Sequence, residues 1–188
     1  MKQRKAFTTL LLFLCTLLMV QILNAQKEFP NRNHSWNLGY SVLHEQLPEG
    51  AEYVPTTLLG NYTLWTLKRF TIYGESQLTQ ASSPFRSQIE FEFGVNFGLR
   101  YRFIQAKNWI LEGAIGAGPH YITIETRRQA NGFIFSDNFE LGTTHFFKGI
   151  NTGLNFKLRY RHISNAGLKN PNGGIDNLFV VMGITSVF

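Results

Sequence analysis

Apolar and polar side chains alternate along most of the chain, and the alternation is strictest over residues 88–103. Every odd position there holds a large apolar side chain, and every even position holds a polar residue or glycine. A period of two is that of a β-strand, whose successive side chains point to opposite faces. A long apolar face needs either the partner sheet of a soluble sandwich or a lipid environment. The lipid environment is favoured because it requires no second sheet of equal length.

The same period predicts eight strands and no helix after residue 35. The predicted strands cover residues 36–42, 57–65, 70–79, 88–103, 109–122, 138–147, 151–163 and 176–188. The connections are long at 44–56, 80–87, 123–137 and 164–175, and short at 66–69, 104–107 and 148–150. Short periplasmic turns and longer outer loops alternate in this way in outer-membrane barrels. We therefore predict an all-β fold, an eight-stranded antiparallel transmembrane β-barrel of the outer-membrane type.

Charged side chains on the polar faces of the predicted strands balance, with five acids and five bases. They are Glu75, Glu90, Glu92, Glu112, Glu140, Arg100, Arg102, Lys157, Arg159 and Arg161. A buried charge is costly unless it is paired, so a balanced set is expected of a barrel interior filled by side chains. A solvated sheet face would tolerate the same charges without requiring the balance.

The N-terminus has the pattern of a secretory signal peptide. A basic start is followed by an uncharged apolar run over residues 6–23 and by the small residue Ala25. We expect a signal peptide at residues 1–25 and a single β-barrel domain at 26–188. An uncleaved anchor is the alternative, because the run is nearly long enough to span a bilayer. Cys15, the one cysteine, lies inside this run, so the mature chain would contain no disulfide.

Composition excludes several classes of partner. Removal of the signal peptide takes away Lys2, Arg4 and Lys5 and lowers the formal net charge from +6 to +3, that is, 6 − 3. This positive charge is too small to indicate nucleic-acid binding. The histidines lack metal-ligand spacing, so no metal or other cofactor is expected. Export and the barrel pattern instead predict residence in the outer membrane of a Gram-negative cell.

Three side chains near the C-terminus carry candidate chemistry. His162, Ser164 and Asp176 are the residue types of a base, a nucleophile and an orienting acid for acyl transfer. Such residues occur in any protein, so their spacing alone favours a structural role. His162 and Ser164, however, share parity with Tyr160 on the lipid-facing row, and counting back from Phe188 brings Asp176 to the same face. Polar groups on the lipid side of a barrel destabilise it, so their presence there indicates a function.

The height of these residues can be estimated from the length of the seventh strand. About twelve tilted residues from the turn at Gly149 to His162 rise on the order of 25–30 Å. This places His162 and Ser164 near the outer-leaflet boundary, where the ester bonds of a lipid lie.

The run at residues 162–168, His-Ile-Ser-Asn-Ala-Gly-Leu, is followed by Pro-Asn at 171–172 and Gly-Ile-Asp at 174–176. This pattern resembles the outer-membrane lipid A 3-O-deacylases, the PagL family. The resemblance implies an esterase that removes an acyl chain from lipid A of lipopolysaccharide in the outer leaflet.

The resemblance also implies a role for each residue of the pattern. Ser164 would be the nucleophile, His162 the base and Asp176 the orienting acid. The oxyanion hole or its support would come from Asn165, Ala166, Gly167 and Asn172. The family has glutamate where Asp176 stands, so the acid here is one methylene shorter.

Two other functions stay open at the level of sequence. One is a non-enzymatic small barrel of the OmpX or OmpA kind, and the other is an outer-membrane phospholipase. The sequence also leaves open a homodimer. Arg127, Arg128 and Lys169 fall in predicted outer loops, where they could contact phosphates of lipid A or serve as ordinary solvated charges.

Overall fold

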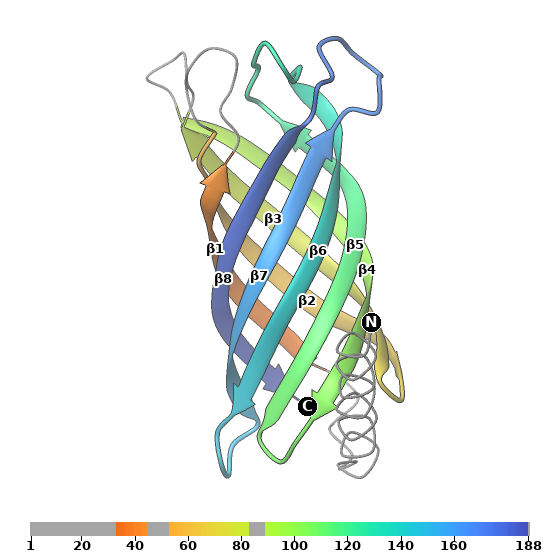
Figure 1. Ribbon diagram of the computed structural model, residues 1–188, viewed down its shortest axis with the longest axis vertical. Coiled ribbons are helices and arrows are strands. Elements are labelled where there is room, and N and C mark those ends of the chain that lie inside the picture. The colour runs from red at the N-terminus through yellow and green to blue at the C-terminus, as the bar shows by residue number, and fades with distance from the viewer. Residues whose placement is uncertain (1–32, 45–52, 83–88, 188) are drawn as a thin grey trace, which may run out of the picture.

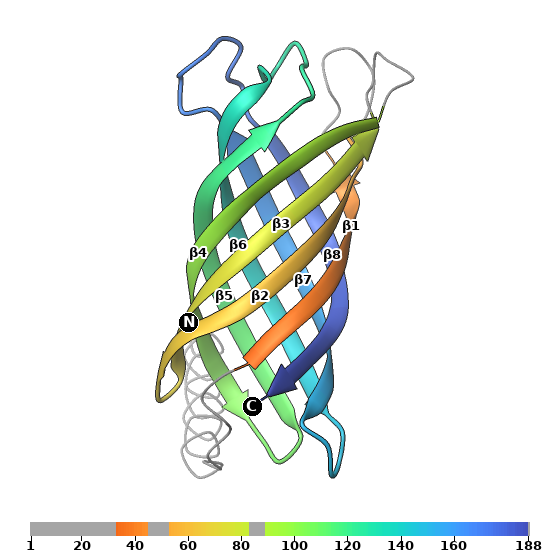
Figure 2. The ribbon, with the colours of Figure 1, turned by 180° about the vertical axis from the view of Figure 1, so that it is seen from behind.

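The computed structural model describes residues 33–44, 53–82 and 89–187, so the predicted signal peptide and Phe188 lie outside the described residues. Eight antiparallel strands form a closed barrel in which each pairs with the next and β1 pairs with β8 (Figures 1 and 2). They are β1 (Asn33–His44), β2 (Pro55–Leu67), β3 (Phe70–Ser82), β4 (Ile89–Gln105), β5 (Trp109–Ile122), β6 (Gly132–Phe146), β7 (Thr152–Ser164) and β8 (Ile175–Val187). The predicted fold is confirmed. No helix within these ranges is long and apolar enough to cross a membrane.

The sixth strand is longer than predicted. It begins at Gly132 rather than at residue 138, because the alternation continues upstream with Phe133 and Phe135 facing outward and Ile134 and Ser136 buried. The connection before it therefore spans 123–131. This correction moves Asp137 from a predicted loop onto the barrel wall.

Short and long connections lie at opposite ends of the barrel. The short turns are at the end where β1 begins and β8 finishes, and the longer β5–β6 and β7–β8 loops are at the other end (Figure 1). β7 runs toward the long-loop end and finishes at Ser164, and β8 starts back from there at Ile175. The candidate residues thus lie at the end that faces the outside of the cell in an outer-membrane barrel.

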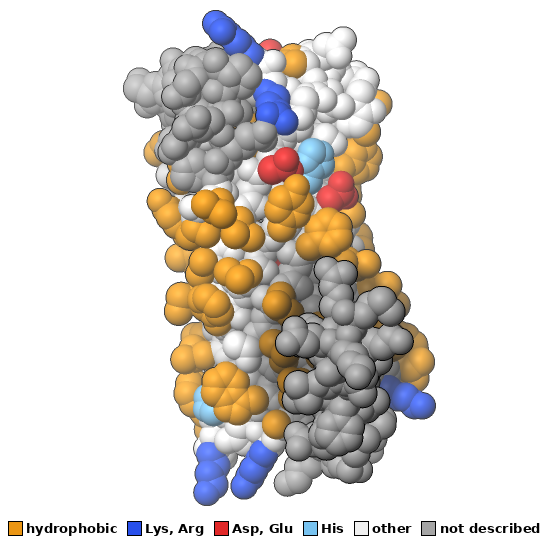
Figure 3. All heavy atoms as spheres, viewed as in Figure 1, with side chains coloured by type: hydrophobic (Ala, Val, Ile, Leu, Met, Phe, Trp, Pro, Cys, Tyr) orange, Lys and Arg blue, Asp and Glu red, His pale blue; other side chains and the backbone are white. Residues whose placement is uncertain are grey.

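The outer wall is apolar around its middle. Figure 3 shows hydrophobic side chains over much of the barrel's height, with Lys and Arg side chains toward the two ends. Phe97 in β4, for example, is 60% exposed. Water-soluble proteins rarely expose a continuous apolar surface of this extent. A wall of such residues is stable in hydrocarbon, in agreement with the membrane location.

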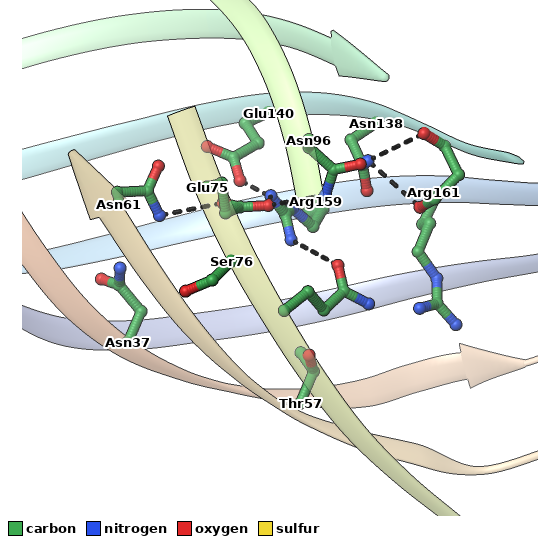
Figure 4. Close-up of polar contacts among 12 residues, drawn as sticks. Asn37, Thr57, Asn61, Glu75, Ser76, Asn96, Asn138, Glu140, Arg159 and Arg161 are labelled. Atoms are coloured by element: carbon green, nitrogen blue, oxygen red, sulfur yellow. Dashed lines mark hydrogen bonds and ion pairs between the residues drawn. The ribbon is translucent and has the colours of Figure 1, made fainter. Parts of the chain in front are cut away.

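The interior is filled by paired charges and amides. Arg159 reaches from β7 to Glu75 in β3 and Glu140 in β6 (Figure 4), and Arg161 donates to both carboxylate oxygens of Glu92 at 2.9 Å. All ten charges that the alternation assigned to the interior are buried. This network joins strands on opposite sides of the barrel and leaves the wall to present the site.

An apolar cluster closes the interior at the long-loop end. Ile163 and Ile175 belong to it, and they are direct cross-strand partners in β7 and β8. Both are fully buried. Because side chains alternate along a strand, burying this pair turns the neighbouring pair, His162 and Asp176, to the outside.

Candidate active site

His162 and Asp176 form a hydrogen-bonded pair on the outer wall. They are cross-strand partners in β7 and β8, and His162 Nδ1 lies 2.7 Å from Asp176 Oδ1. The two side chains are 36% and 40% exposed, so both reach the outer surface. An ionised carboxylate can only accept, so Nδ1 donates and the neutral ring keeps Nε2 as its proton acceptor. This is the tautomer that a general base needs.

Tyr160 also binds the carboxylate. Its hydroxyl donates to Asp176 Oδ1 at 2.7 Å, the same oxygen that accepts from His162. Tyr160 lies two residues before His162 on the same face of β7, diagonal to Asp176 across the strand pair. Sequence reasoning placed this tyrosine on the lipid-facing row but gave it no role. Its parity and the diagonal position were the available signals.

Gly174 determines where the imidazole can lie. A Cβ atom at this position would be 2.5 Å from His162 Cε1 and 3.0 Å from Nε2, and the backbone φ of +69° is one that side chains disfavour. The Nε2 edge of the ring therefore lies over Gly174. The pairing of β7 with β8 ends at Ile163 and Ile175, and Ser164 and Gly174 are the next residues of the two segments.

Ser164 is the last residue of β7 and lies on the same face as His162. It is half-buried and pairs with Phe135 of β6. Within the described ranges, no hydrogen bond joins the Ser164 hydroxyl to the imidazole. Such catalytic hydrogen bonds are often long without substrate and tighten when it binds. The site therefore has a formed acid–base pair, with a serine two residues after the base on the same face of β7.

Asn165 organises the loop that follows β7. Its backbone N–H donates to Asn172 Oδ1 at 2.7 Å, and its side-chain Nδ2 donates to the Lys169 carbonyl at 2.6 Å. Its Oδ1 accepts from the Gly167 N–H at 3.0 Å. The backbone amides of Asn165 and Gly167, expected to serve the oxyanion, are thus already engaged. The turn thus satisfies two of its own donors, and a role of these residues as supports of the oxyanion hole stays a prediction.

Ala166 and Asn172 each keep a donor that this turn does not use. The Ala166 N–H has no acceptor among the residues described, and Ala166 adopts φ +53°, a left-handed conformation uncommon for a residue with a side chain. Asn172 uses Oδ1 to hold Asn165, so its Nδ2 group can donate elsewhere.

The β7–β8 loop is fastened to the β5–β6 loop. Gln129 and Asn172 form an isolated β-bridge, and the Ala130 N–H donates to the Pro171 carbonyl at 2.9 Å. Gln129 and Ala130 are fully buried. The segment carrying Asn165, Ala166 and Asn172 is therefore held by a neighbouring loop as well as by its own hydrogen bonds.

A second carboxylate flanks the imidazole. Asp137 of β6 is the cross-strand partner of His162 on the side away from Asp176, and it is exposed. In the described part of the chain, only Asp176 of the two is hydrogen-bonded to the ring. Figure 3 shows a histidine beside acidic side chains at the upper border of the apolar wall. No group of three or more potential ligands in these residues is arranged to hold a metal ion.

An outer-membrane barrel with a serine, a histidine and an acid on its lipid-facing wall defines a class, that of outer-membrane ester hydrolases. The model of one family, Lipid A 3-O-deacylase (PagL), matches residues 50–185, well over half of the chain. The chain therefore belongs to the lipid A 3-O-deacylase family, as its sequence pattern implied.

Solved structures agree with the fold. The crystal structure of the outer-membrane enzyme PagL is similar with a TM-score of 0.60 and 18% identity, covering 80% of this chain and 97% of that one. Neisserial surface protein A gives 0.57 and 12%, covering 84% and 97%. OprG from Pseudomonas aeruginosa gives 0.52 and 10%, covering 87% and 98%. No curated protein sequence matches the chain.

Proposed function

We propose that this outer-membrane deacylase hydrolyses the ester of the 3-O acyl chain of lipid A through Ser164, His162 and Asp176. Membership of the lipid A 3-O-deacylase family supports the substrate and the reaction. One observation carries the mechanism: the 2.7 Å contact between His162 Nδ1 and Asp176 Oδ1 on the outer wall at the long-loop end. A hydrogen-bonded imidazole and carboxylate facing lipid has no structural purpose in a barrel wall, where apolar side chains are cheaper.

The reaction follows from the tautomer of the imidazole. Ser164 Oγ attacks the ester carbonyl carbon while its proton passes to His162 Nε2, and a tetrahedral oxyanion forms. As the intermediate collapses, the C–O bond to the sugar breaks and Nε2–H protonates the leaving sugar oxygen. Water, activated by the same Nε2, then releases the fatty acid from Ser164. Asp176 stays ionised and stabilises the imidazolium formed in each half-reaction.

Two donors are proposed for the oxyanion, the Ala166 N–H and the side-chain Nδ2 of Asn172. Both belong to the loop directly after the nucleophile, which Asn165 and the β5–β6 loop fasten in place. A donor held rigidly before the reaction stabilises the developing charge without reorganisation. In this assignment Asn165 and Gly167 are supports for the loop and do not contact the oxyanion.

Tyr160 is proposed as a positioning residue. Its hydroxyl and the imidazole N–H share one oxygen of Asp176, which fixes the carboxylate in the plane needed by His162. A charged carboxylate near hydrocarbon is also costly unless hydrogen bonds compensate its lost hydration. Tyr160 supplies such a bond from the same strand as the base.

The lipid-facing position explains how the substrate would reach the site. Lipid A would diffuse laterally, with its acyl chains along the apolar wall and its ester at the height of Ser164. Phe139 and Tyr160 pack at 6.2 Å between ring centroids on this wall below the site. All three catalytic side chains come from one chain, so the mechanism needs no homodimer. Export through a signal peptide at residues 1–25, leaving the barrel at 26–188, is part of the same proposal.

The direct test compares lipid A with phospholipid. Purified, folded protein is incubated with each lipid in detergent micelles, with Ser164→Ala as the blank, and the products are analysed by mass spectrometry. We expect lipid A to lose one 3-hydroxy acyl chain and phospholipid to stay intact. Cleavage of phospholipid alone would identify a phospholipase. Inactivity on both lipids would favour a non-enzymatic barrel and overturn the proposal.

A further inference from the structure

Each short turn of the barrel carries an exposed lysine. Lys68 lies in the β2–β3 turn, Lys107 in the β4–β5 turn and Lys148 in the β6–β7 turn. Within the described ranges, none of these three ammonium groups makes a hydrogen bond or an ion pair. Arg69, next to Lys68, differs, because it donates to the Phe103 carbonyl at 3.3 Å. The three lysines therefore extend from this end of the barrel as unpaired charges.

The two ends of the barrel differ in their surface charge. At the long-loop end, bases and acids that reach the surface are equal in number among the described residues. They are Arg127, Arg128, Lys169, Glu125, Asp137 and Asp176. At the short-turn end, the same part of the chain has the three lysines and Arg69 but no surface acid, because every other described acid is buried. Figure 3 likewise shows basic and no acidic side chains at the lower end of this face.

Aromatic side chains indicate the height of the lysines in the bilayer. Each lysine lies within two residues of an exposed aromatic side chain, the pairs being Lys68 with Phe70, Lys107 with Trp109 and Lys148 with Phe147. Trp109 also packs against His145 with 4.4 Å between ring centroids, and His145 against Phe147 at 6.1 Å. Aromatic girdles mark the border of the hydrocarbon in outer-membrane barrels. A lysine just beyond the girdle extends its ammonium group to the level of the lipid phosphates.

We infer that Lys68, Lys107 and Lys148 bind the phosphates of anionic phospholipid head groups in the inner leaflet of the outer membrane. The charge of such a head group complements an end of the barrel that has surface bases and no surface acid among the described residues. The turns also lie apart, because successive short turns are separated by two strands, or about 10 Å. A layer of lipid presents a head group at every turn, whereas one small soluble anion reaches only one of them.

The test measures the preference of the folded barrel for anionic over zwitterionic phospholipid. The barrel is reconstituted at low ionic strength in phosphatidylcholine vesicles with a trace of spin-labelled phosphatidylglycerol or spin-labelled phosphatidylcholine. The immobilised fraction of each label gives their relative association constant. A lysine near an anionic head group contributes about a fivefold preference at its own contact, so the average over all contacting lipids should be about threefold for the parent. High salt should lower this ratio toward one.

Three sets of variants locate the effect. Replacing Lys68, Lys107 and Lys148 together with glutamine should lower the ratio toward one, whereas replacing the same three with arginine keeps the charge and should keep the preference. Lys107→Gln alone should lower the ratio in part. Arg127→Gln, which removes an exposed charge at the long-loop end, is the matched control and should leave the ratio unchanged. Every variant is compared as folded barrel, identified by its shift in gel mobility on heating.

Four outcomes would overturn the inference. One is a parent that binds both labelled lipids equally. Another is an undiminished preference in the triple glutamine variant, and a third is an equal decrease for Arg127→Gln and Lys107→Gln, which would assign the effect to net charge. The fourth is lysine-dependent sedimentation with purified cell-wall sacculi in a parent without lipid preference, which would assign the lysines to an anionic wall polymer. The active site lies at the opposite end of the barrel, so these outcomes leave the deacylase function intact.

Discussion

The hydroxyl of Tyr160 lies 2.7 Å from Oδ1 of Asp176, the oxygen that also accepts from His162. One carboxylate oxygen thus receives two hydrogen bonds from a single strand, because residues two apart on β7 share a face. The acid is locked to the strand that carries the base. The Asp176 side chain is therefore held in one orientation, although an exposed aspartate would otherwise be free to rotate.

Removing this hydroxyl should impair catalysis without unfolding the barrel. We expect Tyr160→Phe to lower kcat about tenfold with KM unchanged, the loss typical of one hydrogen bond to a charged group. Tyr121→Phe, which removes a hydroxyl from the exposed face of β5, is the matched control. Rates on lipid A are measured for equal amounts of folded protein.

A double-mutant cycle that combines Tyr160→Phe with Asp176→Asn shows whether Tyr160 positions the carboxylate or only packs against the wall. If Tyr160 acts only through the carboxylate, the double variant should be no slower than Asp176→Asn alone. Fully additive losses would contradict the positioning role.

Gly174→Ala should inactivate the enzyme for a steric reason. The new methyl group would lie 2.5 Å from His162 Cε1, so the imidazole would have to move away from Gly174 and out of its present position. We expect a loss of about a hundredfold in kcat, the order of effect of displacing a catalytic group by 1 Å. Gly149→Ala in the β6–β7 turn is the control, because its φ of +82° imposes similar backbone strain with nothing within 4 Å of the added atom. Equal activities of the two variants would show that the glycine does not shape the site.

The part of the site that the sequence predicted is the part that follows from the alternation of side chains between the two faces of each strand. Parity along β7 and β8 placed His162 and Asp176 on the lipid side, and burial of Ile163 and Ile175 explains why the structure agrees. The contacts of Tyr160 and Gly174 could not be predicted in this way. They depend on the register between two strands, which the length and folding of the intervening loop determine and periodicity does not.

The loop itself shows a second limit of sequence reasoning. Asn165, Ala166 and Gly167 all carry backbone N–H groups, and nothing in their order indicates which of them the folded turn will use. Asn165 takes its own N–H and that of Gly167 into hydrogen bonds with side-chain oxygens. Likewise, the start of β6 was missed because Gly132 and the polar residues Ser136 and Asp137 are typical of a loop.

Asn172→Asp separates the two functions of this amide. The aspartate keeps an oxygen that can accept from the Asn165 N–H but removes the Nδ2 donor proposed for the oxyanion. We expect kcat to fall by about 10²–10³, as for loss of one oxyanion donor, with the loop intact. Asn170→Asp is the control, since it makes the same exchange at an exposed position of the same loop. Equal losses in Asn172→Asp and Asn170→Asp would remove Asn172 Nδ2 from the oxyanion hole.

Arg159 should matter for stability and not for the chemistry. It lies in the interior between Glu75 and Glu140, and removing it would leave two buried carboxylates with less compensation. We expect Arg159→Met to destabilise the barrel by about 3–5 kcal/mol. The measurement is the temperature at which the folded band shifts in gel mobility, together with the rate on lipid A at low temperature. Lost activity in a barrel of unchanged thermal stability would contradict this assignment.

Ser164→Ala and His162→Ala distinguish an enzyme from a scaffold most sharply. Both residues lie on the outer wall at the end of β7, outside the buried cluster that holds Ile163, so each variant should insert and resist heat like the parent. Each removes one member of a unit that acts together, so either should lower kcat by several orders of magnitude, and the double variant by little more. Release of the 3-hydroxy acyl chain, followed by mass spectrometry, measures all three. Folded Ser164→Ala that deacylates lipid A at the parent rate would exclude the serine as nucleophile, and additive losses would show that the two side chains act separately.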